Sequence, residues 1–241
     1  MDLVQPDAYC TWRESSLGSI TEEIEQALIW RLAGPLAGLR VLDVGCGDGA
    51  YAMVAAQRGA RVAGVDTSPQ MIEAAQRRAV EQDVQIDLRV ADAAALPFDD
   101  GSFDVVLAVT VLCFVADANM ALRELARVLA PDGRLVIGEL GRWSAWAVLR
   151  RLRGWAGSRL WRAARFRTAG QLRRLVEQAG LRVDEMHGAV FYPPQATLAR
   201  LLAPVDMRLG RATTFGAAFI ALVAVKPLGG SNTFINAGGT P

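Results

Sequence analysis

The sequence predicts an α/β fold: a mostly parallel, seven-stranded sheet with helices on both faces. Short apolar segments rich in β-branched residues alternate with segments of helical periodicity from residue 40 to residue 140. The expected strands are apolar over nearly their whole length, which is typical of strands buried on both faces. The chain of 241 residues, 52% of them hydrophobic, is long enough to bury one such sheet.

The elements of this sheet can be placed in chain order. Ser68 suits the N-cap of the second core helix and Pro69 its first turn, whereas Gly59 and Gly133 are suited to ending elements. Strands are expected over residues 40–45, 61–66, 86–91, 103–109 and 134–140, with helices between them over 50–58, 69–82 and 118–129. A helix over 169–179 and strands over 182–190 and 217–225 complete the seven strands.

The two ends of the chain differ from this core. Ile20, Ile24 and Leu28 follow helical spacing, so we expect an amphipathic helix within residues 9–32 and a lid formed by residues 1–35. Acidic residues close to Met1 argue against a signal peptide, which favours a cytoplasmic protein. Residues 229–241 are rich in Gly, Asn and Thr and are expected to be disordered, which leaves residues 1–228 as a single domain.

A segment of different composition follows the fifth expected strand. Residues 142–174 contain ten arginines, four tryptophans and no acidic residue, and we call residues 142–168 the Arg/Trp insert. Tryptophan and arginine interleaved on a helix suit a membrane interface with anionic lipid, which would make residues 142–167 a peripheral membrane contact. The alternative is a cover over the substrate site, with buried tryptophans and solvated arginines.

Composition narrows the classes of partner. A formal net charge of +1 excludes a uniformly basic nucleic-acid-binding protein, and the acidic remainder of the surface would repel phosphate. Cys10, Cys46 and Cys113 lack the spacing of a disulfide framework or a zinc site, so we expect reduced thiols and no metal. The longest apolar run, residues 215–225, is shorter than the roughly 20 residues that span a bilayer.

The most informative motif is a glycine-rich turn after the first expected strand. Residues 41–49 read VLDVGCGDG, so that Asp43 precedes three glycines, which permit a ligand to approach the backbone closely. A dinucleotide-binding turn has the spacing G-x-G-x-x-G and places a pyrophosphate on the helix N-terminus, which a neighbouring acid disfavours. The spacing here, together with Asp43, favours a cofactor that carries an ammonium group, as the methionine part of S-adenosylmethionine does.

Two more acidic residues end the next two strands. Asp66 lies 21 residues beyond Gly45, where a carboxylate that accepts from both ribose hydroxyls is expected. Asp92 ends the third strand, from which its carboxylate can accept from the exocyclic amine of adenine. Ligands of open α/β sheets bind at the carboxyl ends of the strands, so the three acids predict one adenosine-containing ligand in one crevice.

Residues 41–140 resemble the class I methyltransferases of the ubiquinone and menaquinone biosynthesis type, also called type 11. Besides the glycine turn, the segments ALPFDDGSFDVV at 95–106 and LARVLAPDGRL at 125–135 are typical of that group. The resemblance implies a Rossmann-like fold, S-adenosylmethionine as cofactor, Met71 beside the adenine and Thr110 in the sulfonium region. The residues expected to bind the cofactor are Asp43, Gly45, Cys46, Gly47, Asp66, Thr67, Met71, Asp92, Ala93 and Thr110.

The sequence assigns no catalytic residue. A sulfonium is an activated methyl donor, so the enzyme has mainly to hold the acceptor in line with the methyl group, and a base is needed only for a protonated acceptor. Tyr9, His187 and Tyr192 are the candidates for that role, and Trp12 and Tyr51 for lining the acceptor side. We expect methyl transfer to a small hydrophobic or amphipathic acceptor. The alternatives are a non-catalytic module that binds S-adenosylmethionine or a membrane, and an NAD-dependent oxidoreductase.

Overall fold

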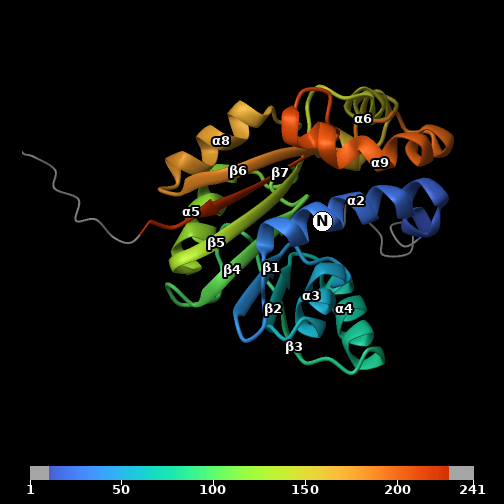
Figure 1. Ribbon diagram of the computed structural model, residues 1–241. Helices are drawn as coiled ribbons and strands as arrows, with labels where there is room; N and C mark the ends of the chain where they lie inside the picture. Colours follow the sequence, from blue (N-terminus) through green and yellow to red (C-terminus); the bar gives the residue numbers. More distant parts are fainter. Residues whose placement is uncertain (1–10, 228–241) are drawn as a thin grey trace, which may run out of the picture.

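The computed structural model describes residues 11–227 and contains one seven-stranded sheet (Figure 1). The strand order is β3-β2-β1-β4-β5-β7-β6, in which β1 to β5 run parallel and β7 is antiparallel to both β5 and β6. The strands are β1 (Arg40–Val44), β2 (Arg61–Asp66), β3 (Ile86–Val90), β4 (Phe103–Val109), β5 (Leu129–Leu140), β6 (Arg182–Ala189) and β7 (Phe219–Val225). The mostly parallel, seven-stranded sheet is therefore confirmed.

Helices cover both faces of the sheet, as predicted. Figure 1 shows α2 (Ser16–Ala33), α3 (Ala50–Gln57) and α4 (Pro69–Glu81) on one face and α5 (Ala118–Val128) and α8 (Ala169–Gln178) on the other. The Arg/Trp insert forms two helices, α6 (Ala145–Trp155) and α7 (Arg159–Ala163). A further helix, α9 (Ala196–Ala212), connects β6 to β7 and packs on α2 and β6.

The core consists of two apolar layers, one on each face of the sheet. Leu42 and Val106 belong to the layer that contains residues of α5 and α8, whereas their neighbours Val41 and Val105 belong to the layer of α2, α3 and α9. This division follows from the alternation of side chains along a strand. The middles of the inner strands are thus mostly apolar, and their polar residues lie mainly toward the strand ends.

Most element boundaries lie within two residues of the sequence prediction, and the largest difference is at the fifth strand. The fifth strand begins at Leu129 because Leu129 pairs with Phe103, ahead of an irregular segment and the pairing of Arg134 with Val105. The helix expected over 118–129 therefore ends at residue 128. The third strand, β3, is mostly exposed because it is an edge strand of the sheet.

The helix predicted within residues 9–32 is present as α2. Ser15 caps it, with its Oγ accepting from the Gly18 N–H at 3.0 Å, and Ile24 and Leu28 are buried against the sheet. Residues 1–10 and 228–241 lie outside the described part of the chain, so the lid and the disordered tail stay predictions. Among residues 11–227, no helix is long and apolar enough to cross a membrane.

Candidate active site

The glycine turn joins β1 to α3 and has the backbone conformation that its glycines allow. Gly45, Gly47 and Gly49 have φ values of 69°, 55° and 80°, in the left-handed region that side chains disfavour. A Cβ atom at Gly45 would lie 2.4 Å from Cγ2 of Val111, so the turn lies directly against the loop after β4. At Gly47 a Cβ atom would meet nothing within 4 Å, which leaves space beside the backbone for a ligand.

Asp66 connects the glycine turn to the start of α4. Its Oδ2 accepts from the Gly47 N–H and its Oδ1 from the Ser68 N–H, both at 2.9 Å. Ser68 in turn caps α4 by accepting from the backbone N–H of Met71, a buried residue of the first turn. Each carboxylate oxygen has a second lone pair, so Asp66 can still accept hydrogen bonds from a ligand. Thr67 is exposed beside it.

Asp43 lies in β1, two residues before Gly45 of the glycine turn, and is 2% exposed. Its Oδ2 has no hydrogen-bond partner in the described part of the chain. Burial raises the pKa of the carboxyl to about 7, and the backbone N–H of Ala52 offsets part of that rise. Burial and the nearby carboxylates also raise the pKa of the Cys46 thiol, so that Cys46 stays protonated and acts as a small apolar residue.

The remaining predicted residues lie at the ends of the neighbouring strands. Asp92 follows β3, and its Oδ1 accepts from the Ala94 N–H at 2.9 Å while Ala93 is buried. Thr110 follows β4 with a φ of 53°, and its N–H donates to the Gly138 carbonyl at 2.7 Å. Because β3, β2, β1 and β4 are adjacent in the sheet, all of the predicted cofactor residues meet at one edge.

A charged network that the sequence analysis missed joins the N-terminal segment to the glycine turn. Oδ2 of Asp48 accepts from Nη1 of Arg13 at 2.8 Å and from Nη1 of Arg78 at 2.9 Å. Nε of Arg13 also donates to Glu22 at 3.0 Å. The sequence could not predict this pairing, because a separation of 35 residues between Arg13 and Asp48 carries no periodicity.

A buried ion pair fixes the loop after β4. Nη1 of Arg167 donates to Glu139 Oε2 and to the carbonyl of Leu112, both at 3.0 Å, and Glu139 Oε1 accepts from the Cys113 N–H at 3.1 Å. Burial raises the pKa of Glu139 to about 7, although Arg167 opposes the rise. The pair therefore ties the end of β5 and the end of the Arg/Trp insert to the loop that borders the glycine turn.

The candidates for proton transfer do not converge. Tyr192 is buried, its hydroxyl lies 3.0 Å from Oγ1 of Thr21, and burial raises its pKa to about 12, so it stays protonated. His187 lies in the edge strand β6, with Nε2 2.9 Å from Glu185, away from the ends of β1 to β4. Tyr9 lies outside the described residues.

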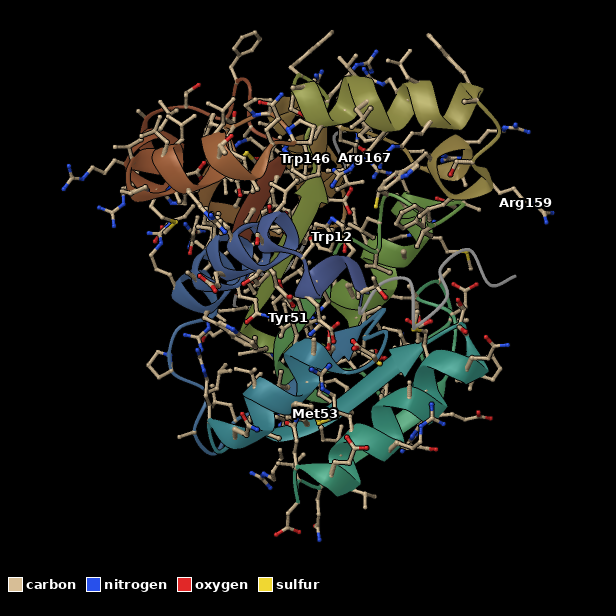
Figure 2. The ribbon with its side chains drawn as sticks, turned by 90° about the vertical axis from the view of Figure 1, so that its right-hand side faces the viewer. Trp12, Tyr51, Met53, Trp146, Arg159 and Arg167 are labelled. Carbon is tan, nitrogen blue, oxygen red and sulfur yellow. The ribbon has the colours of Figure 1, made fainter. Side chains whose placement is uncertain are left out.

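Figure 2 shows two aromatic residues, Trp12 and Tyr51, that the sequence analysis expects on the acceptor side. In the view of Figure 2, Trp12 lies between Tyr51 of α3 and Trp146 of α6. The ring of Tyr51 packs on Trp30 at a centroid distance of 5.4 Å. Within residues 11–227, no cluster of His, Cys, Asp and Glu has the arrangement of a metal site.

Comparison with known proteins places this geometry in a family. Residues 42–137 match the family described as a methyltransferase domain. A ubiquinone biosynthesis O-methyltransferase of Azorhizobium caulinodans is 36% identical over 168 residues, which cover 66% of this chain and 65% of that protein. The chain belongs to the class I S-adenosylmethionine-dependent methyltransferases. The alignment thus spans slightly less than two thirds of this relative's length.

Two further comparisons extend the likeness over most of this methyltransferase. An uncharacterized protein of Mycobacterium tuberculosis is 34% identical over 220 residues, covering 90% of the chain and 71% of that protein. The crystal structure of a SAM-dependent methyltransferase from Thermotoga maritima superposes with a TM-score of 0.69 at 23% identity, over 91% of this chain and 95% of the other. The structural likeness confirms the fold of the family beyond the matched domain.

Proposed function

We propose that this protein transfers a methyl group from S-adenosylmethionine to a small hydrophobic or amphipathic acceptor, by direct in-line attack. The observation that carries the proposal is the convergence of Asp43, Asp66 and Asp92 with the glycine turn at the carboxyl ends of adjacent strands. A cationic adenosine derivative suits such an edge, whereas a pyrophosphate would be repelled.

The residues at this edge fit the cofactor. The free lone pairs of Asp66 suit ribose hydroxyls, and Gly47 leaves space beside the backbone. Oδ2 of Asp43, which has no partner within residues 11–227, suits a nearby positive charge. When bound, the cofactor supplies an activated methyl group. The protein's part is to exclude water and to hold the acceptor in line, a positioning effect that is worth about 7–11 kcal/mol when alignment is good.

The proposed acceptor class rests on the aromatic side of the site and on the relatives. Trp12 lies between Tyr51 and Trp146 in the view of Figure 2, and indole and phenol rings favour apolar ligands. The name of the Azorhizobium relative assigns it an O-methylation in ubiquinone biosynthesis, which is consistent with a small amphipathic acceptor here. The high pKa of Tyr192 argues against that residue as a base.

Replacing Asp66 tests the cofactor assignment. Asp66→Ala removes a carboxylate proposed to accept from the ribose, so we expect S-adenosylhomocysteine to bind more weakly by about 1.5–3 kcal/mol in a calorimetric titration. Asp87→Ala, which breaks an exposed ion pair with Arg89 on β3, is the matched control and should leave the affinity unchanged. Equal affinity of the Asp66 variant and the wild type would refute the ribose role.

Turnover separates the proposal from its alternatives. With methyl-labelled S-adenosylmethionine and fractionated metabolites, soluble and lipid, we expect one labelled product that is absent when Asp43 is replaced by Asn. A module that only binds S-adenosylmethionine would give calorimetric binding and no product in any fraction. Tight binding of NADH without binding of S-adenosylhomocysteine would instead identify an oxidoreductase.

We also propose that residues 142–167 contact an anionic membrane surface. Val148, Leu152 and Trp155 are 55%, 50% and 83% exposed and lie on one face of α6, at a spacing of four and then three residues. Trp143, at 55%, is exposed just before that helix. No acidic residue occurs in the Arg/Trp insert, so no carboxylate within it competes with phosphate groups for its exposed arginines.

Helix α9, which the sequence analysis did not predict, also presents exposed apolar side chains. Leu201, Val205 and Leu209 are exposed at intervals of four residues, and the one acidic residue of α9, Asp206, is 1% exposed. Trp143 and Phe215 line the same shallow depression between the insert and the end of α9. Figure 1 shows α6 and α9 at the same end of the molecule, so both can meet one bilayer.

Vesicle binding tests this surface. The double substitution Leu152→Ala and Trp155→Ala removes apolar area, so we expect partitioning onto phosphatidylglycerol vesicles to fall by about tenfold or more in a sedimentation assay. The matched control is Val80→Ala, since Val80 is 82% exposed on α4 at the other end of the molecule. Equal loss in both variants, or wild-type binding to phosphatidylcholine as strong as to phosphatidylglycerol, would contradict an anionic lipid contact.

A further inference from the structure

Arg150 of α6 holds its guanidinium between two indole rings. Its Cζ lies 5.1 Å from the ring centroid of Trp146 and 4.9 Å from that of Trp161. Aromatic rings attract a guanidinium over their faces, which fixes the plane of the group. Held in this way, Arg150 keeps its N–H donors available at the edge of the plane.

Those donors have no protein acceptor in the described part of the chain. No hydrogen bond or ion pair joins the Arg150 guanidinium to another residue between 11 and 227, whereas Arg167 of the same insert donates to Glu139 and Leu112. Burial lowers the pKa of Arg150, but a guanidinium still keeps its charge. A desolvated cation with unused donors is costly unless a ligand or water takes them.

A carboxylate on the opposite helix is close enough to act on Arg150 without pairing with it. The charges of Glu25 in α2 and of Arg150 shift each other's pKa, although the two side chains form no ion pair within the described residues. Burial raises the pKa of Glu25 to about 7, and the charges of Glu22 and Asp206 add to that rise. With its pKa near 7, Glu25 is partly ionised at neutral pH, and its ionised form opposes further negative charge from a ligand.

The position of Arg150 places it on the acceptor side of the site. The insert that carries Arg150 contacts the loop after β4, where the Arg165 N–H donates to the Cys113 carbonyl at 2.8 Å and the Cys113 thiol contacts the carbonyl of Thr110. Trp146, the neighbour of Arg150, donates its indole N–H to the carbonyl of Tyr192 at 2.9 Å. The insert that holds Arg150 is thereby attached to the segment before α9 and to the loop after β4, and that loop borders the edge where the methyl group is proposed to lie.

We propose that Arg150, held between Trp146 and Trp161, binds a carboxylate of the acceptor, so that the substrate class is a small hydrophobic carboxylic acid. This inference rests on the proposed function, because it assigns a ligand to the acceptor side of that site. A planar guanidinium matches a carboxylate in two parallel hydrogen bonds, and the two indoles offer apolar contact to the rest of the molecule. Glu25 favours a singly charged group over phosphate.

Calorimetric titration of the wild-type protein, saturated with S-adenosylhomocysteine, tests this assignment with benzoate and benzamide. The two probes have nearly the same shape and differ in charge, so benzoate is expected to bind at least about tenfold more tightly. Equal affinity for the two probes, or no saturable binding of benzoate, would overturn the proposal. Inorganic phosphate is the third arm, and a phosphate affinity equal to that of benzoate would overturn the choice of a carboxylate.

Variants at position 150 test whether the preference for benzoate over benzamide depends on the guanidinium. Arg150→Met keeps the stem and is expected to abolish the preference for benzoate, whereas Arg150→Lys should keep part of it. Arg159→Met removes an exposed arginine of α7 in the same insert and should leave the preference unchanged. Unchanged affinity for S-adenosylhomocysteine shows that the variants are folded, and a preference for benzoate that survives Arg150→Met contradicts the assignment.

The labelled-product experiment separates this inference from the proposed function. Benzoate preference without any methylated product would retain the binding site and reject methyl transfer. A neutral methylated product that Arg150→Met forms at the wild-type rate would retain methyl transfer and reject the carboxylate site. We expect a labelled product that an anion exchanger retains, and its loss in the Arg150→Met variant.

Discussion

Arg167→Met is expected to lower the free energy of unfolding by about 3–5 kcal/mol, since it leaves the buried carboxylate of Glu139 without its cation. Glu139 is 1% exposed, and in the variant it keeps the hydrogen bond from the Cys113 N–H but has no cation beside it. Chemical denaturation at pH 8 measures the loss. The loop after β4 borders the glycine turn, so the affinity for S-adenosylhomocysteine should fall in the same variant.

The pH dependence of this loss has a definite sign. With Arg167 present, the pKa of Glu139 is already raised to about 7, and removal of the cation raises it further. A carboxyl whose pKa is raised in the folded state destabilises the protein as pH increases above the unfolded pKa, and the cost is complete above the folded pKa. The variant should therefore lose less stability at pH 5 than at pH 8.

Two control variants test whether the unpaired charge of Glu139 causes the loss of stability. Adding Glu139→Leu to Arg167→Met removes the stranded charge and should restore much of the stability, because apolar replacement of a buried pair is often neutral or better. Arg89→Met breaks an exposed pair with Asp87 and should cost less than about 1 kcal/mol. If Arg167→Met also lowered the free energy of unfolding by less than about 1 kcal/mol, the buried pair would not be what holds the loop.

The sequence predicted the elements whose causes are local. The alternation of apolar strands with periodic helices, the cap at Ser68 and the glycine positions all act within a few residues. Helix α9 was not predicted, because Pro204 interrupts its helical pattern and Asp206 places an acid in its buried face. The carboxylate of Asp206 accepts from the backbone N–H groups of Val190 and Phe191. Those partners are set by tertiary packing, which periodicity does not contain.

The residues of the candidate site also separate into those set by the local sequence and those set by tertiary packing. Asp43, Asp66 and Asp92 could be predicted because each ends a strand and parallel strands share an edge. The pairing of Arg13 with Asp48, and the setting of Arg150 between Trp146 and Trp161, depend on how distant segments fold together. Composition showed that the insert is rich in arginine and tryptophan, but it did not show which arginine is stacked and which is solvated.

Asp43→Asn is expected to make the protein without cofactor more stable at pH 8 while weakening its binding of S-adenosylmethionine. Burial raises the pKa of Asp43 from 3.8 to about 7. The folded wild type thus holds a proton that the unfolded chain releases, and its stability falls as pH rises through this window. The shift corresponds to an upper limit of about 4 kcal/mol above pH 7, which the amide avoids. Below about pH 4 the two proteins should be equally stable.

Ligand binding should respond to pH in the opposite sense. A cofactor ammonium near Oδ2 favours the ionised carboxyl, so wild-type affinity should increase as pH rises through about 7, and the Asn variant should bind weakly with a flat profile. Asp104→Asn is the control, because hydrogen bonds from Arg40 lower the pKa of Asp104 and its loss should destabilise the protein. If Asp43→Asn destabilises the protein at pH 8, or leaves the pH profile of cofactor binding intact, then the buried carboxyl is not the charge that selects a cationic cofactor.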